Sequence, residues 1–213
     1  PSTVSLAFGG GPPESNATEE FVNYQEPSTF QNEGQVFYND TEKKFKLIST
    51  TSAGTFATGG NTNTARFWTR GFGTYNAGAI ASGATSPYQQ TENYDGFVWS
   101  NSGNLSTGRM RGGSGIVSPQ TAGLYFGGRI PPGTIYDDTE EYDGSTWSAG
   151  GDLPATVDGN GGAGTQTAGL SFGGNTPAPG MISATNEYNG SSWTAGGTMG
   201  TAVYNFGSAG TQT

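Results

Sequence analysis

Thr139-Glu-Glu-Tyr-Asp-Gly-Ser-Thr-Trp147 recurs in this chain as Thr185-Asn-Glu-Tyr-Asn-Gly-Ser-Ser-Trp193 and, less closely, as Gln90-Thr-Glu-Asn-Tyr-Asp-Gly-Phe-Val-Trp99. The three tryptophans are spaced by 48 and 46 residues. A second motif repeats with them, as Gln120-Thr-Ala-Gly-Leu-Tyr-Phe-Gly-Gly128, as Gly164-Thr-Gln-Thr-Ala-Gly-Leu-Ser-Phe-Gly-Gly174 and, degenerate, between Gly73 and Gly83. Such a period predicts an array of supersecondary units, each too small to bury its own apolar face.

One repeat divides into strands that predict a four-stranded antiparallel meander. We expect strands at residues 161–167, 169–174 and 182–188, and a last strand that begins near Trp193. Asn189-Gly190 predicts a two-residue hairpin turn, because type I′ turns need the positive φ that Asn and Gly adopt. Asp95-Gly96 and Asp143-Gly144 repeat this signal. The three repeated tryptophans should be equivalent and largely buried, with Phe56 in the fourth place.

Composition supports an all-β fold and excludes much chemistry. Among 213 residues there are 38 Gly, and aromatic residues still make up 12%. Without His or Cys the chain has no Ser-His-Asp triad, no thiolate nucleophile and no ordinary zinc site. The net charge of −9 argues against a nucleic-acid partner, and no apolar run is long enough to span a membrane. We therefore predict a protein that is not an enzyme and has no cofactor, metal or catalytic residue.

An apolar strand that ends in Gly-Gly, followed by Tyr and then by Trp after a short hairpin, resembles the kelch motif of β-propellers. The fuller pattern, with Thr139–Trp147 and Gly164–Gly174 as quoted above, is similar to repeats in virion and tail-associated proteins of tailed bacteriophages, especially marine ones. The resemblance covers most of the chain. It implies a propeller and a virion location, but kelch blades serve many functions.

The two termini together complete one more repeat. Val4-Ser-Leu-Ala-Phe-Gly-Gly10 matches residues 168–174, and the small-residue strand that should precede it is found at residues 208–213. The Gly-Gly positions therefore count four blades, and we expect residues 206–213 to pair with residues 3–9 and close a four-bladed kelch-like β-propeller. The alternative is an excerpt of a longer linear array. The predicted blades of this single domain, 1–213, are I (1–68 plus 206–213), II (69–111), III (112–157) and IV (158–205).

Blade I contains an insertion at residues 23–51. Two alternating apolar runs around Asn39-Asp40 predict an inserted β-hairpin. It is similar to a short hairpin in phage tail and fibre proteins, and it holds all three lysines of the chain. The hairpin is interpreted either as a partner-docking element or as an outer edge whose lysines prevent aggregation. The docking hypothesis assigns partner binding to Val36, Tyr38, Lys43, Lys44, Phe45 and Lys46.

Three other groups of residues are candidate sites. The acidic run Asp137–Glu141 is expected to be a solvated face, because strand alternation keeps its carboxylates from converging on calcium. Arg66 and Arg109 share one repeat position and could grip a carboxylate near a propeller axis, but Val157 and Val203 replace them elsewhere, which favours a structural role. Five aromatic residues could stack on sugars or simply pack between blades: Phe67, Trp68, Tyr88, Tyr136 and Tyr204.

Two functions are compatible with these residues. The first is a non-enzymatic virion component, tail- or fibre-associated or decorating the head, whose partners are other virion proteins or host-surface glycans. Assembly into oligomers is compatible with it. The alternative is a secreted carbohydrate-binding propeller. A lectin should repeat its binding aromatics in each blade, whereas a docking module concentrates its function in one odd blade.

Overall fold

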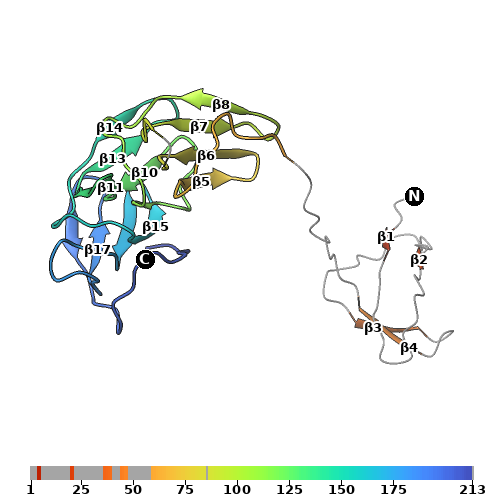
Figure 1. Ribbon diagram of the computed structural model, residues 1–213. Coiled ribbons are helices and arrows are strands. Elements are labelled where there is room, and N and C mark those ends of the chain that lie inside the picture. Colours follow the sequence, from red (N-terminus) through yellow and green to blue (C-terminus); the bar gives the residue numbers. More distant parts are fainter. Residues whose placement is uncertain are drawn as a thin grey trace. The chain divides into compact units, whose positions relative to one another are not determined.

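The computed structural model describes residues 59–84 and 86–212, together with the backbone of four short strands nearer the N-terminus. The chain divides into two compact units, Pro1–Phe56 and Ala57–Thr213. Every regular element in the described residues is a strand, and every strand ladder is antiparallel (Figure 1). The all-β prediction is therefore confirmed for the described part of the chain.

The first unit holds two pairs of strands. β1 (Val4–Ser5) pairs with β2 (Glu20–Phe21), and β3 (Val36–Asn39) pairs with β4 (Lys44–Leu47). In the second pair, which is antiparallel, Tyr38 lies opposite Phe45 and Asn39 opposite Lys44. The hairpin predicted within the insertion is confirmed.

The second unit contains three four-stranded sheets, each with its strands in sequence order as a meander. Sheet 1 consists of β5 (Arg70–Thr74), β6 (Ala77–Ala81), β7 (Thr91–Tyr94) and β8 (Trp99–Ser102). Sheet 2 consists of β9 (Gly113–Ser114), β10 (Gly123–Phe126), β13 (Thr139–Tyr142) and β14 (Trp147–Ala149). Sheet 3 consists of β15 (Gly161–Thr165), β16 (Ala168–Phe172), β17 (Thr185–Tyr188) and β18 (Trp193–Ala195). The predicted meander is confirmed in all three, and sheet 2 carries an extra hairpin, β11 (Arg129–Ile130) and β12 (Thr134–Ile135).

The repeated turn differs from the predicted two-residue type. Tyr188 pairs with Trp193 across the ladder, so four residues form the loop between them. Its glycine has φ +94°, whereas the Asn189 side chain accepts hydrogen bonds from the backbone N–H groups of Ser191 and Ser192 at 2.9 and 3.0 Å. Asp143 makes the equivalent bonds, which lower the pKa of this exposed carboxyl. The first residue of each turn thus acts through its side chain and not through a positive φ.

Sheets 2 and 3 are each joined to the sheet before them by a tryptophan. The indole Nε1 of Trp193 donates to Thr139 Oγ1 of sheet 2, and that of Trp147 donates to Thr91 Oγ1 of sheet 1, both at 2.9 Å. Within its own sheet each ring lies 4.9 Å from a tyrosine. Trp193 is buried as predicted, whereas Trp147 and Trp99 are only partly buried. Phe56, predicted for the fourth place, lies outside the described residues.

An equivalent cross-strand pair in sheets 1 and 3 carries its larger side chain on different strands. In sheet 3 the small Ala163 lies opposite Leu170, whereas in sheet 1 the large Phe72 lies opposite Ala79. The total side-chain volume of this cross-strand pair is thereby kept similar, and such exchanges are well tolerated in protein cores. Phe72 also makes an edge-on contact with Trp147, at 6.1 Å between ring centroids.

The first strands of the sheets approach one another closely. The N–H of Gly73 donates to Ser118 O, and that of Val117 donates to Gly164 O, at 2.8 and 3.2 Å. A Cβ on Gly162 would stand 2.4 Å from the backbone N and O atoms of Ser114, closer than real contacts allow. Glycine is therefore required where sheets 2 and 3 meet.

The C-terminal segment lies beside sheet 3 (Figure 1). Gly164 N–H donates to Gly210 O at 3.0 Å, and Gly162 N–H donates to Ser208 Oγ at 3.1 Å. The segment thus occupies the place beside β15 that a further first strand would take. Residues 205–212 form no ladder with any described strand, and residues 3–9 are described only at β1. The expected closure by the two termini stays a prediction.

Trp193→Ala tests the contact between sheets 2 and 3. Trp193 is only 8% exposed and lies 4.8 Å from Phe126 of sheet 2. Removal of the ring leaves a cavity at this contact, and we expect a loss of about 3–5 kcal/mol in the free energy of unfolding. Urea denaturation measures it. Phe97→Ala, at an 82% exposed ring, is the control and should change little. Equal small losses in both variants would contradict the proposed role of Trp193.

Candidate binding surface

Four loop residues at equivalent repeat positions share a left-handed backbone conformation. Trp68, Arg111, Gly159 and Asn205 have φ values of 59°, 63°, 63° and 54°. Each belongs to the loop that precedes a first strand or the C-terminal segment. We call these four residues the left-handed row.

Backbone hydrogen bonds connect the members of the row. Arg111 N–H donates to Trp68 O at 3.5 Å, Gly159 N–H donates to Arg111 O at 2.7 Å, and Asn205 N–H donates to Gly159 O at 2.9 Å. Successive members are 43, 48 and 46 residues apart in the sequence. Each row residue is therefore hydrogen-bonded, main chain to main chain, to the row residue of the next repeat.

The side chain of Arg111 contacts side chains from the other three row loops. Its guanidinium carbon lies 5.0 Å from the centroid of the Trp68 ring and 4.8 Å from that of the Tyr204 ring. Its Nη2 lies 3.5 Å from the Oδ2 atom of the buried Asp158. Burial lowers the pKa of Arg111 from its ordinary value, although the charge of Asp158 acts in the opposite direction. The first, second, third and fourth row loops thus converge on one cation.

Two further arginines surround this cation. Arg129 Nη1 lies 3.9 Å from Asp158 Oδ2, and the Arg129 side chain is 26% exposed. Arg70 donates from Nε to the backbone oxygen of Gly112, the residue after Arg111. The positive charges of Arg129 and Arg70 both act on Arg111 and lower its pKa. We call Arg70, Arg111, Arg129 and Asp158 the arginine cluster.

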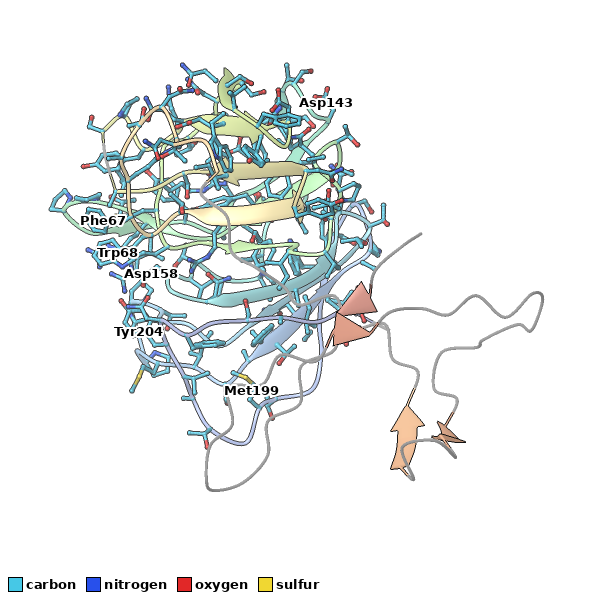
Figure 2. The ribbon with its side chains drawn as sticks, turned by 90° about the vertical axis from the view of Figure 1, so that its right-hand side faces the viewer. Phe67, Trp68, Asp143, Asp158, Met199 and Tyr204 are labelled. Atoms are coloured by element: carbon cyan, nitrogen blue, oxygen red, sulfur yellow. The ribbon has the colours of Figure 1, made fainter. Side chains whose placement is uncertain are left out.

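Aromatic side chains lie at the edge of this cluster. Phe67 and Trp68 are 57% and 45% exposed, and their ring centroids are 4.7 Å apart. Figure 2 shows both on the same side of the molecule as Asp158 and Tyr204, whereas Asp143, in a turn at the other end of the strands, lies apart from them. The row, the arginine cluster and the rings of Phe67, Trp68 and Tyr204 together form what we call the row face.

Of the five predicted aromatic candidates, three come together and two do not contribute contacts to the cluster. Phe67, Trp68 and Tyr204 belong to the row face. Tyr88 and Tyr136 are partly buried in loops within sheets 1 and 2, and no ring contact connects them to it among the described residues. The repeats give a signal for these three residues, because Phe67 and Tyr204 share the repeat position just before the row and Trp68 belongs to the row.

Arg66 and Arg109 have the structural role that the sequence favours. Arg66 Nη2 lies 2.5 Å from Glu92 Oε1, and Arg109 Nη2 lies 3.1 Å from Glu140 Oε1. Glu92 and Glu140 occupy the same place in β7 and β13. Sheet 3 replaces both partners of this pair, with Val157 for the arginine and Asn186 for the glutamate. A cation and its anion have therefore changed together between repeats.

The expectation of a solvated acidic run at Asp137–Glu141 is wrong for part of it. Glu140 is buried against Arg109, and Asp138 contacts the same guanidinium at 2.9 Å. Strand alternation does put Asp138 and Glu140 on one side, as predicted, but a buried arginine faces them there, and of the two only Asp138, whose side chain is 38% exposed, also meets water. Glu141 accepts a hydrogen bond from Tyr188 at 2.7 Å. Among the described residues, no three acidic side chains gather as a metal site would require.

The six predicted docking residues lie in the first unit. The backbones of Val36, Tyr38, Lys44, Phe45 and Lys46 belong to β3 and β4, whereas Lys43 lies outside the described residues. Sequence reasoning missed all four members of the arginine cluster: Arg70, Arg111, Arg129 and Asp158. The repeats do give a signal for Asp158. It is an acidic residue at a repeat position that holds the apolar or aromatic residues Phe67, Met110 and Tyr204 in the other loops.

Comparison with known proteins gives two negative findings: no protein-family model matches the chain, and no curated protein matches it. Across the described residues, no helix is both long and apolar enough to cross a membrane.

The Arg109–Glu140 pair can be exchanged for its counterpart from sheet 3. Arg109→Val alone leaves Glu140 buried beside no cation, and we expect a loss of about 3–5 kcal/mol in the free energy of unfolding. The double variant Arg109→Val with Glu140→Asn reproduces the sheet 3 pair. It should regain most of the free energy of unfolding that Arg109→Val loses. Chemical denaturation of both variants measures the coupling. A double variant no more stable than Arg109→Val would show that the two positions are independent.

Proposed function

We propose that this chain is a non-enzymatic binding protein built on a four-bladed kelch-like propeller, and that it is a component of a tailed-phage virion. In this proposal the inserted hairpin attaches the protein to a neighbouring virion subunit. The row face contacts the molecule that the particle recognises. The virion location rests on the resemblance of the repeats to phage virion proteins.

The propeller rests on the repeat geometry of the second unit. Three sheets have the same meander order, and the second and third are each joined to the one before by a tryptophan and by backbone hydrogen bonds near the first strands. The row has four members, one more than the number of four-stranded sheets, and its fourth member Asn205 leads into the C-terminal segment beside β15. Residues 1–58, with that segment, would supply the fourth blade.

The observation that carries the binding function is the identity of the row residues. Gly159 and Asn205 tolerate the left-handed conformation, and they show what the fold alone requires. Trp68 and Arg111 adopt it at a cost of about 1–2 kcal/mol each. Strained residues of this kind gather at functional sites, where another gain offsets the strain. Here they place an indole and a guanidinium on one face of the protein.

The docking role of the hairpin rests on charge and on its position in the repeat. All three lysines lie at residues 43–46, in a chain of net charge −9. β3 and β4 form a hairpin that the repeats do not contain. Clustered positive charge speeds association with an acidic surface more than it deepens affinity. An acidic patch on a neighbouring subunit is the partner that this chemistry fits.

A secreted carbohydrate-binding propeller is the second candidate. The exposed, closely spaced rings of Phe67 and Trp68 favour it. The corresponding positions in the other loops hold Met110 with Arg111, Asp158 with Gly159, and Tyr204 with Asn205. The rings are therefore not repeated blade by blade, which favours a single recognition site over a lectin with one site per blade.

Deletion of residues 32–47 separates attachment from folding. The variant should keep its β-sheet circular dichroism and its unfolding midpoint, because the repeats do not include the hairpin. When the gene for the variant replaces the wild-type gene, the variant protein should be absent from purified particles, as measured by mass spectrometry of the particles.

Two results would count against this proposal. One is a deletion variant that enters particles at the wild-type level. The other is absence of the wild-type protein from purified particles. The triple variant Lys43→Gln, Lys44→Gln, Lys46→Gln keeps the hairpin and is the matched control, which should slow incorporation without abolishing it.

A further inference from the structure

We propose that the row face binds a glycan that carries carboxylate groups, with Arg129 and Arg111 facing the carboxylate and Phe67 and Trp68 stacking on a sugar ring. This inference rests on the proposed function, since it names the class of ligand that the binding protein recognises. It is carried by the charge, the hydrogen-bonding capacity and the exposed rings of this one face.

Positive charge is in excess here, in an otherwise acidic protein. Two of the five arginines have their own glutamates, Arg66 with Glu92 and Arg109 with Glu140. Arg111 and Arg129 share a single described carboxylate, that of Asp158, at 3.5 Å and 3.9 Å, and among the described residues no ion pair involves Arg70. The cluster thus keeps an excess of about two positive charges, counting arginine as always ionised. An anionic ligand would be drawn to this face and repelled by the rest of the acidic surface.

Part of the hydrogen-bonding capacity of the cluster is unused. The Nε atoms of Arg111 and Arg129 and both carboxylate oxygens of Asp158 are buried without a hydrogen-bond partner in the described part of the chain. Buried polar groups without partners are costly, so native proteins rarely leave several together. The arginines offer donors in the fork geometry that matches a carboxylate. The Asp158 side chain is fully buried, so it holds the arginines in place, and the partly exposed Arg129 is the group that a ligand carboxylate can reach.

The exposed rings decide between a sugar acid and an acidic peptide. Phe67 and Trp68 are largely exposed, and the Trp68 ring also contacts Arg111. An exposed aromatic face next to a charged group suits the apolar C–H face of a pyranose, with the carboxylate of the same sugar reaching the cation. A peptide carboxylate needs only the cation and would give these rings no comparable partner. The observations therefore favour an acidic glycan.

Isothermal titration calorimetry with tetragalacturonate tests the proposal. The neutral control ligand is the same oligosaccharide with every carboxylate methyl-esterified, and polyglutamate tests an acidic peptide. We expect wild-type protein to bind tetragalacturonate, the methyl ester to bind at least ~10-fold more weakly, and added salt to weaken the binding of the acid. Polyglutamate should bind more weakly than tetragalacturonate.

Three variants locate the binding. Arg129→Gln removes a partly exposed cation, and Phe67→Ser removes an exposed ring; each should weaken tetragalacturonate binding by ~10-fold or more. Phe97→Ser removes an 82% exposed ring in a β7–β8 turn, outside the row face, and should leave binding unchanged. Circular dichroism confirms that each variant is folded.

Several results would overturn the inference. Equal affinity for the acid and its ester would show that charge is not recognised. Tighter binding of polyglutamate would identify an acidic protein segment as the ligand, and equal losses in Phe67→Ser and Phe97→Ser would place the binding elsewhere. Absence of binding to tetragalacturonate would also refute the inference. None of these results affects the hairpin deletion experiment, which tests the virion role independently.

Discussion

Segments from different repeats meet in this protein through their main chains. Where the first strands approach, N–H and C=O groups bond directly from Gly73 to Ser118, from Val117 to Gly164 and from Gly164 to Gly210. A single added Cβ at Gly162 would prevent this approach. At the other end of the strands, the left-handed row repeats the same device with loop residues. Such contacts leave no room for a bulky core along this line, so the apolar side chains lie between the sheets.

The row face follows from this constraint. Because the row loops must meet, the side chains next to each row residue are gathered in a small area whatever their chemistry. In two repeats the row residue is Gly or Asn and adds little, whereas Trp68 and Arg111 project into the shared area. Asp158 and Tyr204 come from the residues just before the row and complete the set around Arg111. The fold thus concentrates variable residues at one place while the sheets stay alike.

The sequence predicts the elements well because its repeats carry strong local signals. Alternation before Gly-Gly and the recurrent Tyr and Trp predict the three meanders, and the two apolar runs predict the β3–β4 hairpin. The turns are harder to predict, because Asn and Asp can act through φ or through the side chain, and the Asn189 side chain caps the turn. Glu140 looks solvent-facing in the sequence because its cation, Arg109, comes from a loop about thirty residues earlier.

The arginine cluster could not be predicted by comparing equivalent positions alone. Arg111 belongs to the row, but Arg70 lies on β5 and Arg129 on β11 of the extra hairpin, so the three do not share a repeat position. The fold brings the charges of Arg111 and Arg129 to the Asp158 carboxylate and places Arg70 against the backbone of Gly112. By contrast, Arg66 and Arg109 share a position that the repeats reveal, and each is used within its own sheet. Arg66 and Arg109, which are alike at one equivalent position, have a structural role, whereas the residues of the candidate site differ from repeat to repeat or have no repeat equivalent.

In the proposed propeller the four row positions belong to a ring closed by the two termini. Electron paramagnetic resonance between spin labels at Thr3→Cys and Gln212→Cys measures this closure directly, because the chain has no native cysteine. Paired strands hold their Cα atoms about 5 Å apart. A closed ring predicts one narrow, short distance distribution that broadens and lengthens in denaturant. A long or broad distribution in the native protein would contradict a closed ring.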